Sequence, residues 1–171
     1  CFPKQWQLAL APETGVLVID YELPSLEFLP TLKAVKYVQS KDAFESSILK
    51  DSELAQLYDA AMYQTCLRTL YEVFASDSAD AIKTTTFNGW VNFIDKSTGK
   101  QARACIMSLQ AEKGAFLQIN LAAVEPKGCV RALKGVGSSK RAGRAAVVPI
   151  LQFNKNDDRF VAARDVIDEE G

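Results

Sequence analysis

Residues 135–144, GVGSSKRAGR, combine glycine, serine and cationic side chains in a pattern that suits contact with phosphate groups. Glycine lets a backbone approach an anion closely, and Lys140, Arg141 and Arg144 supply positive charge. Two nucleotide-binding motifs do not fit. In a Walker A loop glycine precedes the lysine, whereas here Ser139 does, and in the dinucleotide fingerprint Lys140 would occupy the place of the last glycine. Two interpretations therefore stay open: a flexible connector with solvated cations, and a contact with a nucleic-acid backbone.

The cations of this loop belong to a longer basic segment, residues 127–144, which contains six basic residues and no acidic residue. The sequence PKGCVRALKG predicts a short helix that Glu125 caps, that Pro126 opens and that Gly135 ends. Spacings of four and three residues would place three of the cations on one helix face. We therefore expect DNA phosphates to be contacted by Lys127, Arg131, Lys134, Lys140, Arg141 and Arg144.

A second candidate site lies on the predicted hairpin WVNFIDKSTGKQARACIMSLQ, whose turn is Asp95–Gly99. Alternation predicts that Phe87, Val91 and Phe93, with Cys105, Met107 and Leu109, face the core. Asn88-Gly89 is interpreted as a bulge inside a long strand. The opposite face would carry polar groups beside an indole and could bind a base or another planar ligand; its residues are Asn88, Trp90, Asn92, Ser108 and Gln110. The alternative is a solvated or interdomain face.

Several kinds of catalytic site are disfavoured by residue content. The chain has no histidine, and its four cysteines, at 1, 66, 105 and 129, form no CxxC pair, which disfavours zinc sites and histidine-dependent nucleophiles. Cys66, Cys105 and Cys129 are expected to be reduced core residues. The nearest match to a PD-(D/E)xK nuclease is Asp95 with SLQAEK. There Gln110 and Glu112 are in phase, but the adjacent Lys113 points the other way, so we assign no catalytic and no metal-binding residue.

The elements that must position these residues form a mixed α/β (α+β) domain in the prediction. A hairpin around Pro12–Gly15 comes first. A long, largely buried helix follows; Asp51 caps it, and Leu57, Leu67 and Leu70 lie on its apolar stripe. LKAVKYVQ is a short strand or the end of a loop. After the second hairpin and the short helix, AAVVPILQF is predicted as the final strand, with Pro149 at an edge or bulge.

This order of elements around one sheet is compatible with a degenerate restriction-endonuclease-like core. We expect one globular domain over residues 1–156, made of an N-terminal β-hairpin extension (1–50) and a helix–hairpin–helix–strand core (51–156). Residues 157–171 are expected to be a tail or linker. With 48 % hydrophobic residues, a net charge of −1, no signal peptide and no long apolar run, the sequence predicts a cytoplasmic protein without a membrane partner.

Several stretches resemble the region that precedes the C-terminal catalytic domain in bacterial Mrr-type restriction endonucleases. They are TFNGWVNFIDKSTGKQARACIMSLQ, INLAAVEPKGCVRALKGV and FNKNDDRFV, with PETGVLVIDYELPSLEFLPTLKAVKYVQ and LYDAAMYQTCLRTLYEVF earlier in the chain. In that family the nuclease motif, Asp-Gly-Gly-x-Asp followed by Gln-x-Lys, lies further downstream. The Asp-Gly-Gly-x-Asp element does not occur in these 171 residues, so the motif is absent, and DVIDEEG stands where a linker is expected. The resemblance carries no catalytic residue over to this chain.

The resemblance implies an accessory domain of a phage-defence nuclease. The prediction is a non-catalytic recognition or regulatory domain that contacts DNA through residues 127–144. The first alternative is a protein-interaction or oligomerisation domain that gates a nuclease without touching DNA, and the second is a degenerate or active PD-(D/E)xK nuclease. No cofactor is expected in this segment, and Mg²⁺ is expected only in a downstream nuclease domain. The expected partners are DNA and that downstream domain of the same chain, with homo-oligomerisation left open.

Overall fold

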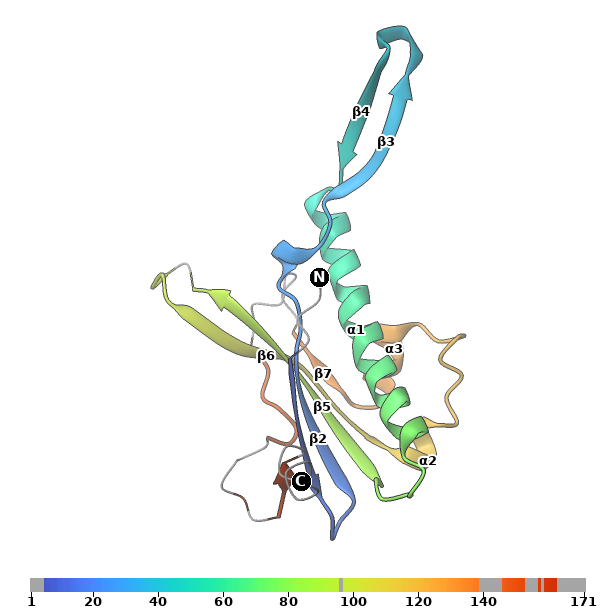
Figure 1. Cartoon of the computed structure of the whole chain (residues 1–171), viewed down its shortest axis with the longest axis vertical. Coiled ribbons are helices and arrows are strands. Elements are labelled where there is room, and N and C mark those ends of the chain that lie inside the picture. Colours follow the sequence, from blue (N-terminus) through green and yellow to red (C-terminus); the bar gives the residue numbers. More distant parts are fainter. Residues whose placement is uncertain (1–4, 96, 139–145, 153–156, 158, 163–171) are drawn as a thin grey trace, which may run out of the picture.

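The computed structural model describes residues 5–95, 97–138, 146–152, 157 and 159–162, and it shows the predicted mixed α+β fold (Figure 1). A six-stranded sheet has the order β7-β6-β5-β2-β1-β8, and β3 and β4 form a separate two-stranded sheet. The strands are β1 (Trp6–Ala11), β2 (Val16–Glu22), β3 (Leu32–Val38), β4 (Ala43–Ile48), β5 (Thr84–Ile94), β6 (Gln101–Glu112), β7 (Val136–Gly137) and β8 (Val161–Ala162). The helices are α1 (Asp51–Ser76), α2 (Lys113–Phe116) and α3 (Pro126–Ala132), with 3₁₀ turns η1 (Leu26–Phe28) and η2 (Gln39–Lys41).

Two antiparallel hairpins, β1–β2 and β5–β6, build the large sheet as predicted. Each turn contains a glycine with positive φ, 65° at Gly15 and 67° at Gly99, which is the conformation that such turns require. The two hairpins meet where β2 pairs with β5 in parallel. A parallel pair needs a crossover connection, and α1 provides it between β2 and β5 (Figure 1).

Helix α1 packs on one face of the sheet and contributes much of the core. Tyr58, Cys66 and Leu70 are almost completely buried there, whereas Leu57 is 42 % exposed, so the apolar stripe is narrower than the sequence suggests. The predicted cap at Asp51 is wrong by one residue. The cap position is Lys50, and its backbone N–H donates to Glu53 Oε2 at 2.9 Å. Asp51 is instead the first helical residue, where its negative charge suits the helix dipole.

The second hairpin contains a bulge, but not on the strand that carries Asn88-Gly89, where it was predicted. Strand β5 runs through Asn88-Gly89, and the extra residue at the register shift is Ile106 of β6, which has no partner on β5. Trp90 consequently pairs with Cys105, and Ile106 joins Met107 in the core cluster. Cys105 was predicted on the core face with Met107, but because of the bulge it lies on the face of Trp90.

The predicted final strand is wrong, because residues 146–152 form no strand. This segment lies along the face of the sheet opposite α1 and is held mainly by side chains. The Val147 N–H donates to the Cys105 carbonyl at 2.8 Å, and the Ile150 N–H donates to Ser108 Oγ at 2.9 Å. Pro149 has no N–H to donate, which prevents regular pairing. Further on, Val161–Ala162 of the predicted tail pairs with β1 as β8.

Within the described part of the chain, no helix is both long enough and apolar enough to cross a membrane.

Candidate functional site

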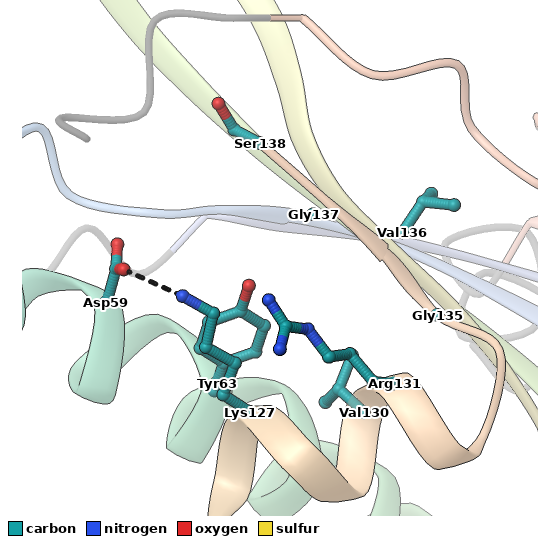
Figure 2. Close-up of a pocket in the computed structure, with 9 residues that line it drawn as sticks. All are labelled: Asp59, Tyr63, Lys127, Val130, Arg131, Gly135, Val136, Gly137 and Ser138. Carbon is teal, nitrogen blue, oxygen red and sulfur yellow. Dashed lines mark hydrogen bonds and ion pairs between the residues drawn. The ribbon is translucent and has the colours of Figure 1, made fainter. Parts of the chain in front are cut away.

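A pocket of about 450 Å³ lies between α1, α3 and β7, and two of the predicted phosphate-binding cations line it (Figure 2). Helix α1 contributes Asp59 and Tyr63, and α3 contributes Lys127 and Arg131. The remaining lining residues are Val130, Gly135, Val136, Gly137 and Ser138.

The local sequence explains why α3 presents its cations here. The Glu125 carboxylate accepts hydrogen bonds from the N–H groups of Lys127, at 3.0 Å, and of Gly128, and Pro126 occupies the first helical position. These features confirm the predicted helix start. A spacing of four residues then places Lys127 and Arg131 on one helix face.

Lys134 does not share that face. Helix α3 ends at Ala132, and Lys134 follows it with a φ of 60°, in the left-handed region. The Gly135 N–H returns to the Val130 carbonyl at 2.9 Å and closes the helix end. The predicted triad of cations is therefore a pair in the structure. Lys140, Arg141 and Arg144 lie outside the described residues.

The two cations of the pocket differ in their carboxylate partners. Lys127 Nζ lies 3.5 Å from Asp59 Oδ2 and 5.8 Å from the centre of the Tyr63 ring. Among the described residues, no carboxylate forms an ion pair with Arg131. Burial raises the pKa of the Tyr63 hydroxyl, and the negative charge of Asp59 raises it further. Tyr63 therefore keeps its proton at neutral pH and can donate a hydrogen bond.

The β7 wall of the pocket depends on a residue without a side chain. Strand β7 pairs with β6 through Gly137 opposite Met107, and the Ser138 N–H donates to the Ile106 carbonyl at 2.7 Å. A Cβ atom on Gly137 would lie 2.8 Å from Tyr63 Oη, which is closer than carbon and oxygen normally approach. Glycine at this position lets the strand pass directly over the Tyr63 hydroxyl.

The arrangement suits a small anionic group better than a neutral ligand. Two cations and one carboxylate give the pocket a net positive charge, and the Arg131 guanidinium and Tyr63 hydroxyl lie close together in Figure 2. Guanidinium and hydroxyl groups are donors that phosphate oxygens accept from. Ser138 lines this pocket, and the cations Lys140, Arg141 and Arg144 follow it in the sequence.

The polar face of the second hairpin is not an open ligand site at its centre. Asn88 and Ser108, both predicted as ligand-facing, are fully buried under residues 146–152. The Asn88 amide donates to Asp20 Oδ1 at 2.9 Å and to the Leu151 carbonyl at 2.8 Å. Ser108 Oγ donates to Asn88 Oδ1 at 2.8 Å. These groups hold the C-terminal segment against the sheet.

The outer residues of that face do not form a common site either. Trp90 is half-buried, and the Arg103 guanidinium lies 4.6 Å from its ring centre. Asn92 and Gln110 are exposed on separate strands beyond the covered region. The interpretation of this face as one binding surface is therefore corrected: its centre is an internal packing surface.

The residues nearest to a nuclease motif have structural roles. Lys113 Nζ lies 2.8 Å from Asp77 Oδ2 and 2.9 Å from Asp80 Oδ1, and these contacts tie the end of β6 to the loop after α1. Asp95 accepts hydrogen bonds from Ser97 and Thr98 in its turn. Across the described ranges, no group of three or more histidine, cysteine, aspartate or glutamate side chains is placed to hold a metal ion. Cys66, Cys105 and Cys129 are buried, as expected.

Two pocket residues were missed by sequence reasoning. Tyr63 was assigned to the apolar stripe of the long helix, and Asp59 was given no role. A signal for Tyr63 exists, because a buried tyrosine needs a partner for its hydroxyl, but the sequence does not say where that partner lies.

Searches against protein-family models, curated proteins and solved structures found no match to this chain.

Proposed function

We propose that this chain is a non-catalytic recognition or regulatory domain of a bacterial restriction-endonuclease-like protein, and that it contacts DNA through residues 127–144. The observation that carries the proposal is the position of Lys127 and Arg131 in one pocket at the start of the basic loop. This placement puts two of the six cations beside the residues from which the rest of the basic segment follows in the sequence.

The chemistry of the pocket indicates a contact with the phosphate backbone and not with base edges. Arg131 is the better phosphate ligand, because Asp59 already neutralises part of the Lys127 charge. Tyr63 adds a neutral donor beside Arg131. Backbone contacts carry little sequence information, so binding through this surface is weak, sequence-independent and strongly dependent on salt.

The nuclease part of the proposal rests on the resemblance to the region upstream of the catalytic domain in Mrr-type enzymes. In that view, cleavage and its Mg²⁺ belong to a domain that follows this chain. The present residues would position that domain on DNA or control its access to it. The fold class agrees with such a module, and the helix–hairpin–helix order is compatible with a degenerate restriction-endonuclease-like core.

A salt titration of duplex DNA binding tests the proposal. Replacing Arg131 by glutamine removes one phosphate contact, so the slope of log affinity against log salt should fall by about 0.9. The triple alanine variant of Lys140, Arg141 and Arg144 should lower it by roughly 2–3 for the same reason. Arg68→Gln is the matched control, because it removes an exposed cation that pairs with Glu72 on α1.

The control should leave the slope unchanged. If Arg131→Gln and Arg68→Gln give the same titration curve as the unmodified chain, the pocket makes no phosphate contact and the proposal fails.

The alternative function, an interaction module that gates a nuclease, is favoured by a different observation: the exposed apolar side chains of the β3–β4 hairpin. It predicts altered assembly, and no change in DNA affinity, when that hairpin is changed.

A further inference from the structure

The β3–β4 hairpin projects away from the body of the protein at the N-terminal end of α1 (Figure 1). Side-chain hydrogen bonds and ion pairs hold its local structure. Tyr37 Oη donates to Asp42 Oδ1 at 2.6 Å near the tip, and Lys41 Nζ pairs with Glu45 at 2.6 Å. At its base, Lys33 forms an ion pair with Glu53 of α1. The hairpin is thus ordered along its length although almost every residue in it is exposed.

Apolar and charged side chains of this hairpin lie on opposite faces. Tyr37 pairs with Phe44, and their ring centres are 5.4 Å apart. The register places Val35 opposite Ser46 and Leu32 opposite Ile48. One face therefore contains Leu32, Val35, Tyr37, Phe44, Ser46 and Ile48, which we call the apolar hairpin face. The directly opposed Lys36 and Glu45 lie on the other face.

A β-bulge completes the apolar hairpin face. Leu32 and Val35 are three residues apart, so regular alternation would place them on opposite sides of the ribbon. The register shift between Leu32 and Ala34 inserts one extra residue, Lys33, and turns Leu32 to the side of Val35 and Tyr37. The irregularity thus extends an uncharged surface along the whole hairpin.

This face is large and strongly exposed for a solvated surface. Its five large apolar residues are between 47 % and 75 % exposed. Together they present roughly 600 Å², which is at the upper end of the largest apolar patches on monomeric proteins. An isolated two-stranded ribbon is also marginally stable in water unless another element covers its apolar face. Both arguments favour a partner that packs on the hairpin.

We propose that the partner is a second copy of this chain, with the two apolar hairpin faces stacked antiparallel around a two-fold axis through Val35. Along the face, residue size runs from large (Leu32 and Ile48) through small (Val35 and Ser46) to large (Tyr37 and Phe44). In the antiparallel stack, the aromatic tip of each copy lies on the aliphatic base of the other. Sheets stack about 10 Å apart, which leaves room for these side chains to interdigitate.

The absence of charge on the apolar hairpin face and the area that it buries support the pairing of two copies. A two-fold axis brings the same residues together, and the face contains no charge that would be repelled by its own copy. Two such faces bury about 1,200 Å² in total, which is enough for a specific but modest interface with a micromolar dissociation constant. The antiparallel arrangement also leaves the two protein bodies at opposite ends of the dimer.

Sedimentation equilibrium on the full 171-residue chain tests the proposal. We expect a concentration-dependent dimer that Val35→Glu weakens at least about 10-fold, because it buries a carboxylate at the centre of the interface. Ala34→Glu is the matched control. It adds the same charge to the adjacent exposed residue on the opposite face, and it should leave the dimer intact.

A cysteine variant keeps the test valid if the glutamate disturbs the hairpin itself. Val35→Cys places two thiols on either side of the two-fold axis, too far apart for a disulfide between sheets about 10 Å apart. A short bis-maleimide should therefore cross-link Val35→Cys into a dimer and should not cross-link Ala34→Cys. A chain that stays monomeric at concentrations of about 100 μM, well above the expected dissociation constant, would overturn the proposal. Equal effects of Val35→Glu and Ala34→Glu, or equal cross-linking of the two cysteine variants, would overturn it as well.

Discussion

Replacing Asn88 by alanine tests whether the polar face of the second hairpin is an internal packing surface. The Asn88 side chain is fully buried and makes three hydrogen bonds, to Asp20, to Ser108 and to the carbonyl of Leu151. The first two partners lie on β2 and β6, and Leu151 belongs to the covering segment. Loss of the amide therefore affects the sheet and its cover together.

The expected loss of stability follows from these three contacts. A buried hydrogen bond to a neutral partner contributes about 1 kcal/mol, and one to a charged partner contributes about 1.5–3 kcal/mol. Asp20 is only 9 % exposed, so its carboxylate has little access to water as a substitute partner. Together the contacts predict that Asn88→Ala lowers the free energy of unfolding by about 3–5 kcal/mol.

Urea denaturation measures this change, and hydrogen exchange locates it. The amide of Ile150, which donates to Ser108 Oγ, should lose protection in the variant. Asn92→Ala is the matched control, because Asn92 lies on the same strand but is exposed, and it should change stability by less than about 0.5 kcal/mol. If the two variants are equally stable, the buried network does not hold the segment and our account of this face is wrong.

Three further predictions concern the core, the pocket and the ion pair at the end of β6. Leu70 is 0 % exposed, so Leu70→Ala should lower the free energy of unfolding by about 2–5 kcal/mol in urea denaturation, and an unchanged midpoint would contradict its burial. Gly137→Ala should cost about 1–3 kcal/mol by crowding Tyr63 Oη, and less in a Tyr63→Phe background; an equal cost in both backgrounds would exclude that contact. The hydrogen bond from Lys113 lowers the pKa of Asp77, so this pair stabilises the fold above the ordinary aspartate pKa of 3.8 and stops doing so as pH falls through the lowered value. Stability measured below pH 3.8 should therefore fall less steeply in Asp77→Asn, and identical pH profiles would refute this linkage.

Features set by neighbouring residues could be predicted from the sequence. The turns at Gly15 and Gly99 and the start of the short helix at Glu125 depend on the conformational preferences of a few adjacent residues. A bulge was predicted at Asn88-Gly89, because an internal Asn-Gly rarely continues a regular strand, but the extra residue is Ile106 on the partner strand β6. Because the bulge on β6 was missed, the side on which Cys105 lies was predicted wrongly.

Features that depend on distant residues could not be predicted. AAVVPILQF has the composition of a strand, but the neighbouring surface binds it through Asn88 and Ser108, which leave few backbone partners. The ribbon β3–β4 was missed as a unit, because AFESSI alternates weakly and the bulge at Lys33 breaks the pattern of its partner strand. The pocket brings Tyr63 to Arg131 across 68 residues of sequence, a proximity that arises only when α3 packs on α1.

The hairpin and the pocket are joined through α1, and the geometry of this connection predicts how the two proposals interact. Glu53 holds the base of the hairpin, and Asp59 and Tyr63 line the pocket about two turns further along the helix. In the antiparallel dimer, the two pockets are separated by one hairpin length of about 20 Å and by about 12 Å of helix on each side, roughly 45 Å in total. A duplex of about 10 base pairs is about 34 Å long and cannot reach both pockets.

Val35→Glu should therefore leave the affinity for that short duplex unchanged, whereas Arg131→Gln should weaken it. On duplexes of about 30 base pairs, Val35→Glu should also weaken binding, because it removes bivalent attachment. A loss of short-duplex affinity in Val35→Glu would show that the hairpin itself contacts DNA, and the separation of the two surfaces argued here would then be wrong.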